Sequence, residues 1–325
     1  MSNFLNVALA QIEPVWLNRT KTIEKMLLYI EQAAGQHAHL VVFGEGLLPG
    51  YPFWLSITNG ATFEDHWQKQ MYAWYQQQAV DISAGDLGPI TEACREYGIA
   101  AYVGCIEKTS MQRGKSVFCS LVYIDTTGVI ESVHRKLMPT FEERLVWAQG
   151  DGNGLVTHNN NGFSVGGLNC WENWMPMARQ SLYAQGEEVH IAVWPGGLHN
   201  TQDITPFIAK ESRSYVVSVS GLMSLNALTA DMPFYDALKP AFEQALNESE
   251  SDYLANGGSC VVAPNGQWLL EPIVDREALS VISLDKELIL QERQNFDPAG
   301  HYARPDVLSL TINNQRQSTI NIVEQ

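Results

Sequence analysis

Short apolar runs that alternate with helical segments are the feature that most constrains the fold of this 325-residue chain. Several of the runs are rich in Val, Ile and Tyr and end at Gly, Pro or Asp, as β-strands commonly do. They fall at residues 5–11, 40–44, 99–107, 116–125, 163–170, 189–195, 214–221, 259–264 and 279–285. The runs predict a protein built around β-sheets.

Helical periodicity appears in the segments between these runs. Segment 18–37 places Ile23 and Ile30 on one face at helical spacing. Segments 85–98 and 203–215 have a proline early, followed by good helix formers. The alternation predicts an α/β layered fold in which helices cover the faces of the sheets.

The connections predict mixed sheets and a single domain. The sequence Thr-Thr-Gly separates run 116–125 from a further strand candidate at 129–134, a pattern that predicts a hairpin. A strong linker, a low-complexity tract and a short repeat are all absent from the sequence. We therefore expect one domain over residues 1–310, followed by a polar, unpatterned tail at 311–325.

Composition and charge narrow the class of function. Hydrophobic residues make up 45% of the chain, which is enough to bury a sizeable core. The formal net charge is -16, which argues against extended contact with nucleic acid or an anionic membrane and disfavours anionic substrates. These properties favour a small neutral substrate.

The N-terminal sequence and the cysteines predict a cytoplasmic protein. The first residues lack a basic stretch, and polar residues interrupt their apolar part, so they do not resemble a secretion signal. The sequence also lacks an apolar run of the ~18 residues that a membrane-spanning helix needs. The five cysteines are odd in number and scattered, without a Cys-x-x-Cys pair, which favours a reducing compartment.

Cys170 is the first candidate for chemistry. A free cysteine is most often a small buried hydrophobic residue. Here, however, Gly166 and Gly167 precede Cys170 and a bulky polar segment follows it, so we expect the chain to turn sharply at the end of a strand. Such a turn presents a side chain and the following N–H groups to a pocket. We interpret Cys170 as a nucleophile and assign structural roles to the remaining cysteines, Cys94, Cys105, Cys119 and Cys260.

A thiol nucleophile needs a base, because the thiolate is the reactive form. Glu45 directly follows an apolar strand candidate and precedes another apolar segment. A carboxylate at a strand end is often simply solvated, but a desolvated one has a raised pKa and accepts a proton near neutral pH. Glu45 is therefore the candidate base.

Lys136 is the candidate cation. It follows a predicted strand, and we expect Leu137, Met138 and Phe141 to hold its stem among apolar groups, whereas a lone loop lysine is usually solvated. We interpret its neighbours His134 and Arg135 as structural. Glu142 and Glu143 follow closely, and because they are adjacent, only one of them can face a given pocket.

These three stretches together resemble a known family. Glu45 in FGEGLLPGYP, Lys136 in HRKLMPTFEER and Cys170 in CWENWMP are similar, in the same chain order, to the Glu-Lys-Cys triad motifs of the nitrilase superfamily of carbon-nitrogen hydrolases. The resemblance runs from residues 7–16 to residues 301–310. Cys-Trp-Glu-Asn followed by Met-Pro is similar to the nitrilase branch.

The resemblance implies a four-layer α-β-β-α sandwich and neither a metal nor an organic cofactor. It also implies a second glutamate near the triad, which the pattern assigns to Glu143, and self-association into a homodimer or a larger homo-oligomer. Gly44 stands where many members carry proline, so we expect a looser backbone before Glu45.

The activity implied is hydrolysis of an organic nitrile to a carboxylic acid and ammonia. Glu45 would accept the thiol proton, Cys170 would form a covalent thioimidate and then a thioester, and Lys136 with the Trp171 N–H would stabilise the developing negative charge. Two alternatives stay open. One is an amidase or N-carbamoyl amide hydrolase that uses the same triad, and the other is a non-catalytic binding or scaffold member.

Aromatic residues near the motifs are candidates for an apolar substrate wall. Core packing would explain each of them about equally well. They are Tyr51, Trp54, Trp171 and Trp194.

Overall fold

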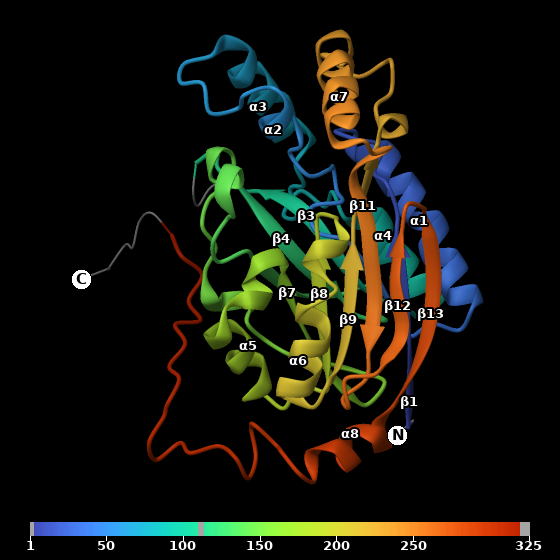
Figure 1. Ribbon diagram of the computed structural model, residues 1–325, viewed down its shortest axis with the longest axis vertical. Coiled ribbons are helices and arrows are strands. Elements are labelled where there is room, and N and C mark those ends of the chain that lie inside the picture. Colours follow the sequence, from blue (N-terminus) through green and yellow to red (C-terminus); the bar gives the residue numbers. More distant parts are fainter. Residues whose placement is uncertain (1–2, 110–113, 319–325) are drawn as a thin grey trace.

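The computed structural model describes residues 3–109 and 114–318, whose core consists of two β-sheets packed face to face (Figure 1). One sheet has the strand order β13 (Ala278–Asp285), β1 (Phe4–Gln11), β2 (Leu40–Phe43), β3 (Ala100–Lys108), β4 (Val117–Ile124) and β5 (Ile130–Arg135). The other has the order β10 (Leu222–Ser224), β11 (Tyr253–Val262), β9 (Tyr215–Ser220), β8 (Val189–Trp194), β7 (Phe163–Asn169) and β6 (His158–Asn160). A further strand, β12 (Trp268–Val274), pairs with β11.

Both sheets are mixed, as the sequence predicts. Strands β1, β2 and β3 are parallel neighbours in the first sheet, and β7, β8 and β9 are parallel neighbours in the second. Strands β4 and β5 form the predicted antiparallel hairpin. The parallel centres bring the carboxyl ends of β2, β7 and β8 to one end of the sandwich.

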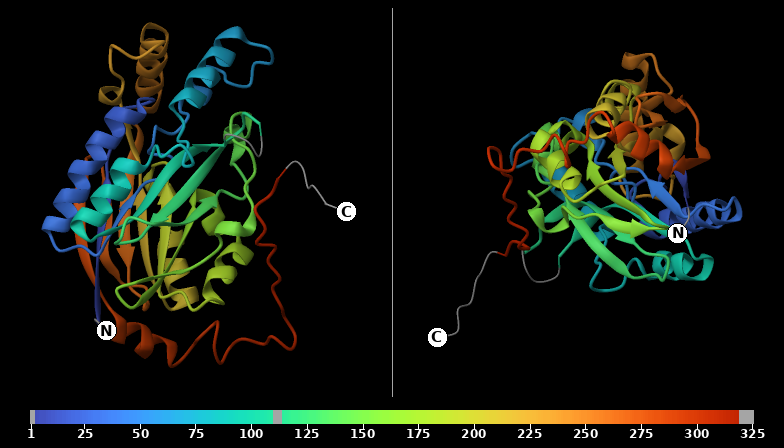
Figure 2. Two further views of the ribbon diagram at one scale, coloured as in Figure 1. Left: turned by 180° about the vertical axis from the view of Figure 1, so that it is seen from behind. Right: turned by 90° about the horizontal axis from the view of Figure 1, so that it is seen from below.

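Helices cover the outer faces of both sheets (Figures 1 and 2). Along β1, Val7 and Leu9 pack into the layer between the sheets, whereas Ala8 and Ala10 pack toward the helices on the outside. These helices are α1 (Arg19–Gly35) and α4 (Gly88–Tyr97) on the first sheet, and α5 (Pro176–Tyr183) and α6 (Ile204–Ser212) on the second. The predicted α-β-β-α sandwich is therefore confirmed.

Additional helices lie at the two ends of the sandwich. Helices α2 (Trp54–Ile57), α3 (His66–Gln78) and α7 (Tyr235–Ser249) gather at the upper end in Figure 1, where the rings of Trp67 and Phe234 lie 6.0 Å apart. Helix α8 (Lys286–Arg293) lies at the opposite end, near the N-terminus. Within the described ranges, no helix is both long and apolar enough to cross a membrane.

The backbone before Glu45 is closely packed, contrary to the looser backbone expected from Gly44. A Cβ atom on Gly44 would lie 3.2 Å from the Gly221 nitrogen. The carbonyl oxygen of Gly44 would lie 2.0 Å from a Cβ atom on Gly104, so only a glycine at position 104 allows this approach. The absence of side chains lets neighbouring strands close in and hold this segment in place.

The chain after α8 runs along the outside of the molecule (Figure 1). Residues 311–318, the described part of the predicted tail, have no helix or strand, and residues 319–325 lie outside the described residues. Arg316 nevertheless binds the body, because its guanidinium donates to Asp151 at 3.0 Å and to the Val133 carbonyl at 2.6 Å.

Candidate active site

Lys136 lies at the centre of a buried cluster of charges. Its backbone N–H continues the line of β5 by donating to the Cys119 carbonyl at 2.8 Å. Its Nζ atom donates to Glu45 Oε1 at 2.8 Å and to Glu143 Oε2 at 2.7 Å, and the side chain is 1% exposed. Burial alone would lower the pKa of Lys136, but the surrounding acidic groups outweigh burial and raise it well above its ordinary value. The group is therefore an ammonium at neutral pH.

Glu45 follows β2 and is held by its own backbone, whose N–H donates to the Trp194 carbonyl at 3.3 Å. Burial raises the pKa of the Glu45 carboxyl from 4.5 to about 7, and the Lys136 ammonium opposes this rise. Its Oε2 atom is buried and lacks a hydrogen-bond partner among the described residues. Glu45 thus has one oxygen fixed by the ammonium and one oxygen available to a proton.

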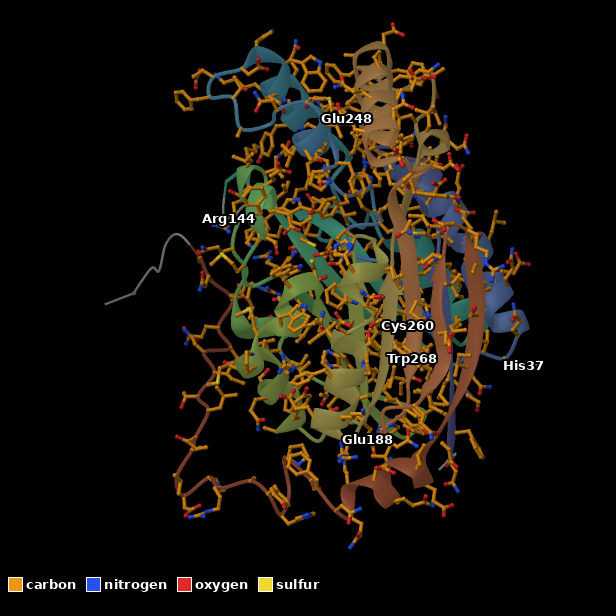
Figure 3. The ribbon with its side chains drawn as sticks, viewed as in Figure 1. His37, Arg144, Glu188, Glu248, Cys260 and Trp268 are labelled. Carbon is orange, nitrogen blue, oxygen red and sulfur yellow. The ribbon has the colours of Figure 1, made fainter. Side chains whose placement is uncertain are left out.

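Glu143 lies on the short 3₁₀ helix η1 (Phe141–Leu145) that follows Lys136. Its Oε2 atom accepts from Lys136 and from the Thr140 N–H at 2.6 Å, and its Oε1 atom accepts from the Tyr51 hydroxyl at 2.8 Å. Arg144, the next residue, is exposed at the edge of the molecule (Figure 3). Of the two adjacent glutamates, Glu143 is 1% exposed and bonds Lys136, whereas Glu142 is half-buried. The prediction that only one of them faces a given pocket was wrong, because both line the cavity described below.

Cys170 stands where β7 ends and the 3₁₀ helix η3 (Cys170–Trp174) begins. Its φ angle is 47°, a left-handed conformation that costs a non-glycine residue about 1–2 kcal/mol. The predicted sharp turn is therefore present. Burial and then the Glu45 carboxylate raise the pKa of the Cys170 thiol well above its ordinary value. The Lys136 ammonium and, to a smaller degree, a hydrogen bond from the Trp171 backbone N–H oppose that rise. The resting group is a thiol that needs a base.

A buried chain of hydrogen bonds holds the strained turn from behind. The Asn173 amide donates to the Cys170 carbonyl at 2.8 Å. The amide oxygen of Asn173 lies 2.8 Å from His190 Nε2, and His190 Nδ1 lies 3.0 Å from the Glu187 carboxylate. These contacts offset the conformational cost at Cys170.

The cluster brings the thiol close to both carboxylates. Oxygen atoms of Glu45 and Glu143 and the Cys170 sulfur all lie within 4.8 Å of one another. These atoms are also the donors that a metal ion would use, but the Lys136 ammonium already bonds both carboxylates. The positive charge of this site is therefore supplied by the protein itself.

A cavity of about 320 Å³ opens onto Cys170 and Glu143. Tyr51 and Trp171, two of the predicted wall residues, line it. Its other lining residues are Phe53, Ser56, Thr140, Glu142, Pro195, Gly196, His199, Asn200, Leu254 and Ala255. Polar and charged side chains thus contribute as much to the lining of the cavity as aromatic and apolar ones.

The structure does not place Trp54 and Trp194 in this cavity. Trp54 packs in the core against Trp16 and Tyr75, with ring centroids 6.4 Å and 4.8 Å away, and its remaining surface faces a separate cavity. Trp194 is fully buried at the end of β8, and its indole N–H donates to Ser218 at 3.4 Å. Core packing therefore accounts for both residues.

Two contacts of the buried charge cluster lie outside the motifs used in the sequence analysis. The Cys119 thiol donates to Glu45 Oε1 at 3.5 Å, so Cys119 is more than the packing residue that we expected. Lys136 Nζ lies 5.5 Å from the centre of the Trp147 ring. The expectation that Met138 and Phe141 would cover the lysine was wrong, because their side chains are 45% and 76% exposed.

The cations next to Lys136 have structural partners, as expected. Arg135 forms a two-pronged ion pair with Glu107, at 2.8 Å and 2.5 Å, on the neighbouring part of the sheet. His134 Nε2 lies 3.1 Å from both carboxylate oxygens of Glu172. Cys260, labelled in Figure 3, is buried on β11, and its thiol contacts the Thr205 hydroxyl.

Comparison with known proteins identifies the family. A model of the carbon-nitrogen hydrolase family matches residues 6–294. The chain belongs to the carbon-nitrogen hydrolase family. This hydrolase is 32% identical to an aliphatic nitrilase from Rhodococcus rhodochrous over 98% of this chain and 82% of that protein. It is 31% identical to Nitrilase 1 from Arabidopsis thaliana, over 99% of this chain and 90% of that protein.

A solved structure supports the fold. An amidase of the nitrilase superfamily from Nesterenkonia AN1 matches this hydrolase with a TM-score of 0.64 at 16% identity, over 90% of this chain and 94% of that chain. The predicted resemblance to the nitrilase superfamily is therefore confirmed, and the protein is an enzyme that hydrolyses carbon-nitrogen bonds of nitriles or amides.

The buried charges give a prediction about stability. Replacing Lys136 by Met leaves two buried carboxylates without their shared cation, and breaking such a group costs about 3–5 kcal/mol of unfolding free energy. The pKa of Glu45 is already raised with the ammonium present, and it rises further without it. In the unchanged protein Glu45 ionises only near pH 7, so the part of the loss that comes from its charge is small below neutrality and grows as pH rises above about 7.

Urea unfolding of Lys136→Met and of the unchanged protein at about pH 5 and about pH 8 measures this difference. Lys239→Met is the matched control, because Lys239 forms an exposed pair with Glu243 and its loss costs about 1 kcal/mol or less at either pH. An equal loss at both pH values for Lys136→Met would contradict the buried-charge account.

Proposed function

We propose that this enzyme hydrolyses a small neutral organic nitrile to the carboxylic acid and ammonia. The observation that carries the proposal is the Cys170 thiol within 4.8 Å of two carboxylates that share one buried ammonium, with Cys170 and Glu143 lining a cavity. The similarity to proteins named nitrilases over nearly the whole chain supports a nitrile as the substrate.

The first step forms a carbon-sulfur bond. The free Oε2 atom of Glu45 accepts the thiol proton, and the Cys170 sulfur attacks the nitrile carbon. One bond of the triple bond breaks, and its electron pair moves to the nitrogen, which takes the proton from Glu45 to give a thioimidate and the free carboxylate. The Lys136 ammonium and the Trp171 N–H stabilise the negative charge that develops.

Two molecules of water complete the reaction. Glu45 removes a proton from the first water, which adds to the thioimidate carbon, and the protonated amine leaves as ammonia, so that a thioester remains. The second water attacks the thioester, and the carbon-sulfur bond breaks to give the carboxylic acid and the free thiol. In total, one nitrile and two waters yield one acid and one ammonia.

Glu143 and Tyr51 serve this chemistry by holding the lysine. Glu143 binds the ammonium directly and is itself fixed by the Tyr51 hydroxyl and the Thr140 N–H. Because these partners are in place before the substrate arrives, little reorganisation is needed when charge develops in the transition state. Tyr51 and Trp171 also supply aromatic surface to the cavity.

A matched panel of nitriles and their corresponding amides tests the function. We expect nitriles to be turned over with release of ammonia, and the acid to be the main product by chromatography, because two carboxylates beside the ammonium favour a protonated amine as the leaving group. Cys170→Ala, expected to lose about 10⁴-fold or more in kcat, controls for other sources of turnover. Hydrolysis of the amides alone would assign an amidase, and amide as the main product from nitriles would assign a hydratase-like activity.

The raised pKa of Glu45 predicts the pH profile. The base acts only when it is deprotonated, so kcat/KM falls as pH drops through the Glu45 pKa of about 7. Lys136 keeps its proton well into the alkaline range, since its pKa is raised well above the ordinary value. Initial rates of ammonia release should therefore rise with pH and level off. An acid limb centred near the ordinary glutamate value of 4.5 would contradict this role of Glu45.

A further inference from the structure

Glu172 is a buried carboxylate that the proposed reaction does not use. It lies on η3, two residues after Cys170, and is 1% exposed. Burial by itself would raise the pKa of Glu172, but His134 and two backbone N–H groups outweigh burial and lower it below the ordinary value. A charge is thus kept in the interior, a few residues from the nucleophile.

The two oxygens of Glu172 connect the segments that carry the lysine and the cysteine. One oxygen accepts from the Leu137 N–H at 2.6 Å, and Leu137 directly follows Lys136. The other accepts from the Asn169 N–H at 2.9 Å, and Asn169 directly precedes Cys170. The carboxylate therefore binds the backbone of the residue next to Lys136 and also that of the residue next to Cys170.

This connection is significant because Lys136 and Cys170 come from different sheets. Lys136 follows β5, at the edge of the first sheet, and Cys170 follows β7, in the second. Ladder hydrogen bonds do not join β5 to β7, whereas hydrogen bonds to a buried charged group are among the stronger ones in a protein. Glu172 thus supplies polar contacts between the ends of β5 and β7. Side-chain packing alone would define the relative position of these two ends less precisely.

We propose that Glu172 is a positioning residue that fixes the Lys136 ammonium relative to the Cys170 thiol. The proposal rests on the catalytic roles given to Lys136 and Cys170 under the proposed function. His134 completes the arrangement, since its Nε2 atom lies 3.1 Å from both oxygens of the Glu172 carboxylate.

Glu172→Gln tests the proposal with little change in shape. An amide has one acceptor oxygen and one NH₂ group, so either the Leu137 or the Asn169 N–H faces another donor and the two segments separate. Misplacement by about 1 Å can cost on the order of 10²-fold in rate. We expect kcat to fall by about that factor with KM changed by less than about threefold, because the cavity walls are untouched.

Glu107→Gln is the matched control. It also breaks a buried ion pair, with Arg135 beside Lys136, but Glu107 does not contact the backbone of the catalytic residues. Both variants should lose similar stability in urea unfolding, whereas only Glu172→Gln should lose kcat by more than about tenfold. Loss of kcat in proportion to stability in both variants would overturn the positioning role.

Alkylation of Cys170 by iodoacetamide gives a readout that does not depend on the substrate. If the ammonium is displaced, the thiolate is less stabilised, so the rate of alkylation should fall about tenfold in Glu172→Gln and its pH midpoint should rise. Mass spectrometry of the peptide that contains Cys170 separates this reaction from that of the other cysteines. This test works even if the unchanged protein proves not to hydrolyse nitriles, because alkylation needs no substrate. Alkylation of Glu172→Gln at the rate of the unchanged protein would refute the positioning role.

Glu172→Asp decides the matter if the glutamine variant fails to fold. The aspartate keeps the charge beside His134 but is one methylene shorter, so it cannot reach both backbone N–H groups. Positioning predicts a kcat loss of at least about tenfold together with slower alkylation. Wild-type values for both would show that the charge alone is needed, and would overturn the proposal.

Discussion

The Lys136 ammonium, buried between Glu45 and Glu143, is the interaction on which the rest of the site depends. Three charged groups are costly to remove from water, and they are tolerated only where the geometry lets each one satisfy the others. Here the two ammonium-carboxylate distances are 2.8 Å and 2.7 Å, and Glu143 accepts two further hydrogen bonds. Both carboxylates are thereby fixed with oxygen atoms within 4.8 Å of the Cys170 sulfur.

The sandwich positions this cluster by bringing strand ends together. Glu45 follows β2 and Lys136 follows β5 of one sheet, while Cys170 follows β7 of the other, and the two sheets share one apolar layer. Contact between apolar side chains fixes the distance between the two sheets, but it does not fix the exact position of single residues at the strand ends. Hydrogen bonds also hold the backbone around Cys170: Asn173 donates to the Cys170 carbonyl, and Glu172 accepts from the N–H of the preceding residue, Asn169.

Strain at Cys170 and desolvation at Glu45 have a common origin in this packing. The left-handed turn at Cys170 points the thiol at the carboxylates, and the close approach of Gly44 to Gly104 carries Glu45 into the interior, where burial raises its pKa. Burial alone is therefore enough to make Glu45 a group that titrates near neutral pH.

Much of the sandwich could be predicted from the sequence, because its central strands are apolar runs of four or more residues with clear ends. Strands β6 and β10 have three residues each, which is too short for a recognisable pattern. Helix α7 contains Pro240, a residue that argues against a helix in a sequence-based prediction. Helix α3 is rich in Gln and aromatic residues and buries only Met71 and Tyr75, so its periodicity is weak.

The four charged and thiol residues of the site were predicted as a set because each stands in a distinctive motif. The surroundings of Trp54 and Cys119 could not be predicted from the sequence. Residues distant in the chain decide whether such a side chain faces the core, the cavity or Glu45. Glu172 lies inside the Cys170 motif, but its partners Leu137 and His134 are more than 30 residues away, and sequence spacing does not reveal that contact. Self-association into a homodimer or larger assembly stays a prediction.

The most direct test of the account is to trap the covalent intermediate. Enzyme mixed with a nitrile that is turned over is quenched with acid in the steady state, digested and examined by mass spectrometry. The account predicts that the peptide containing Cys170 gains the mass of the substrate's acyl or imidoyl group, while the peptides containing Cys119 and Cys260 stay unmodified. Turnover accompanied by an adduct on another residue, and none on Cys170, would contradict it.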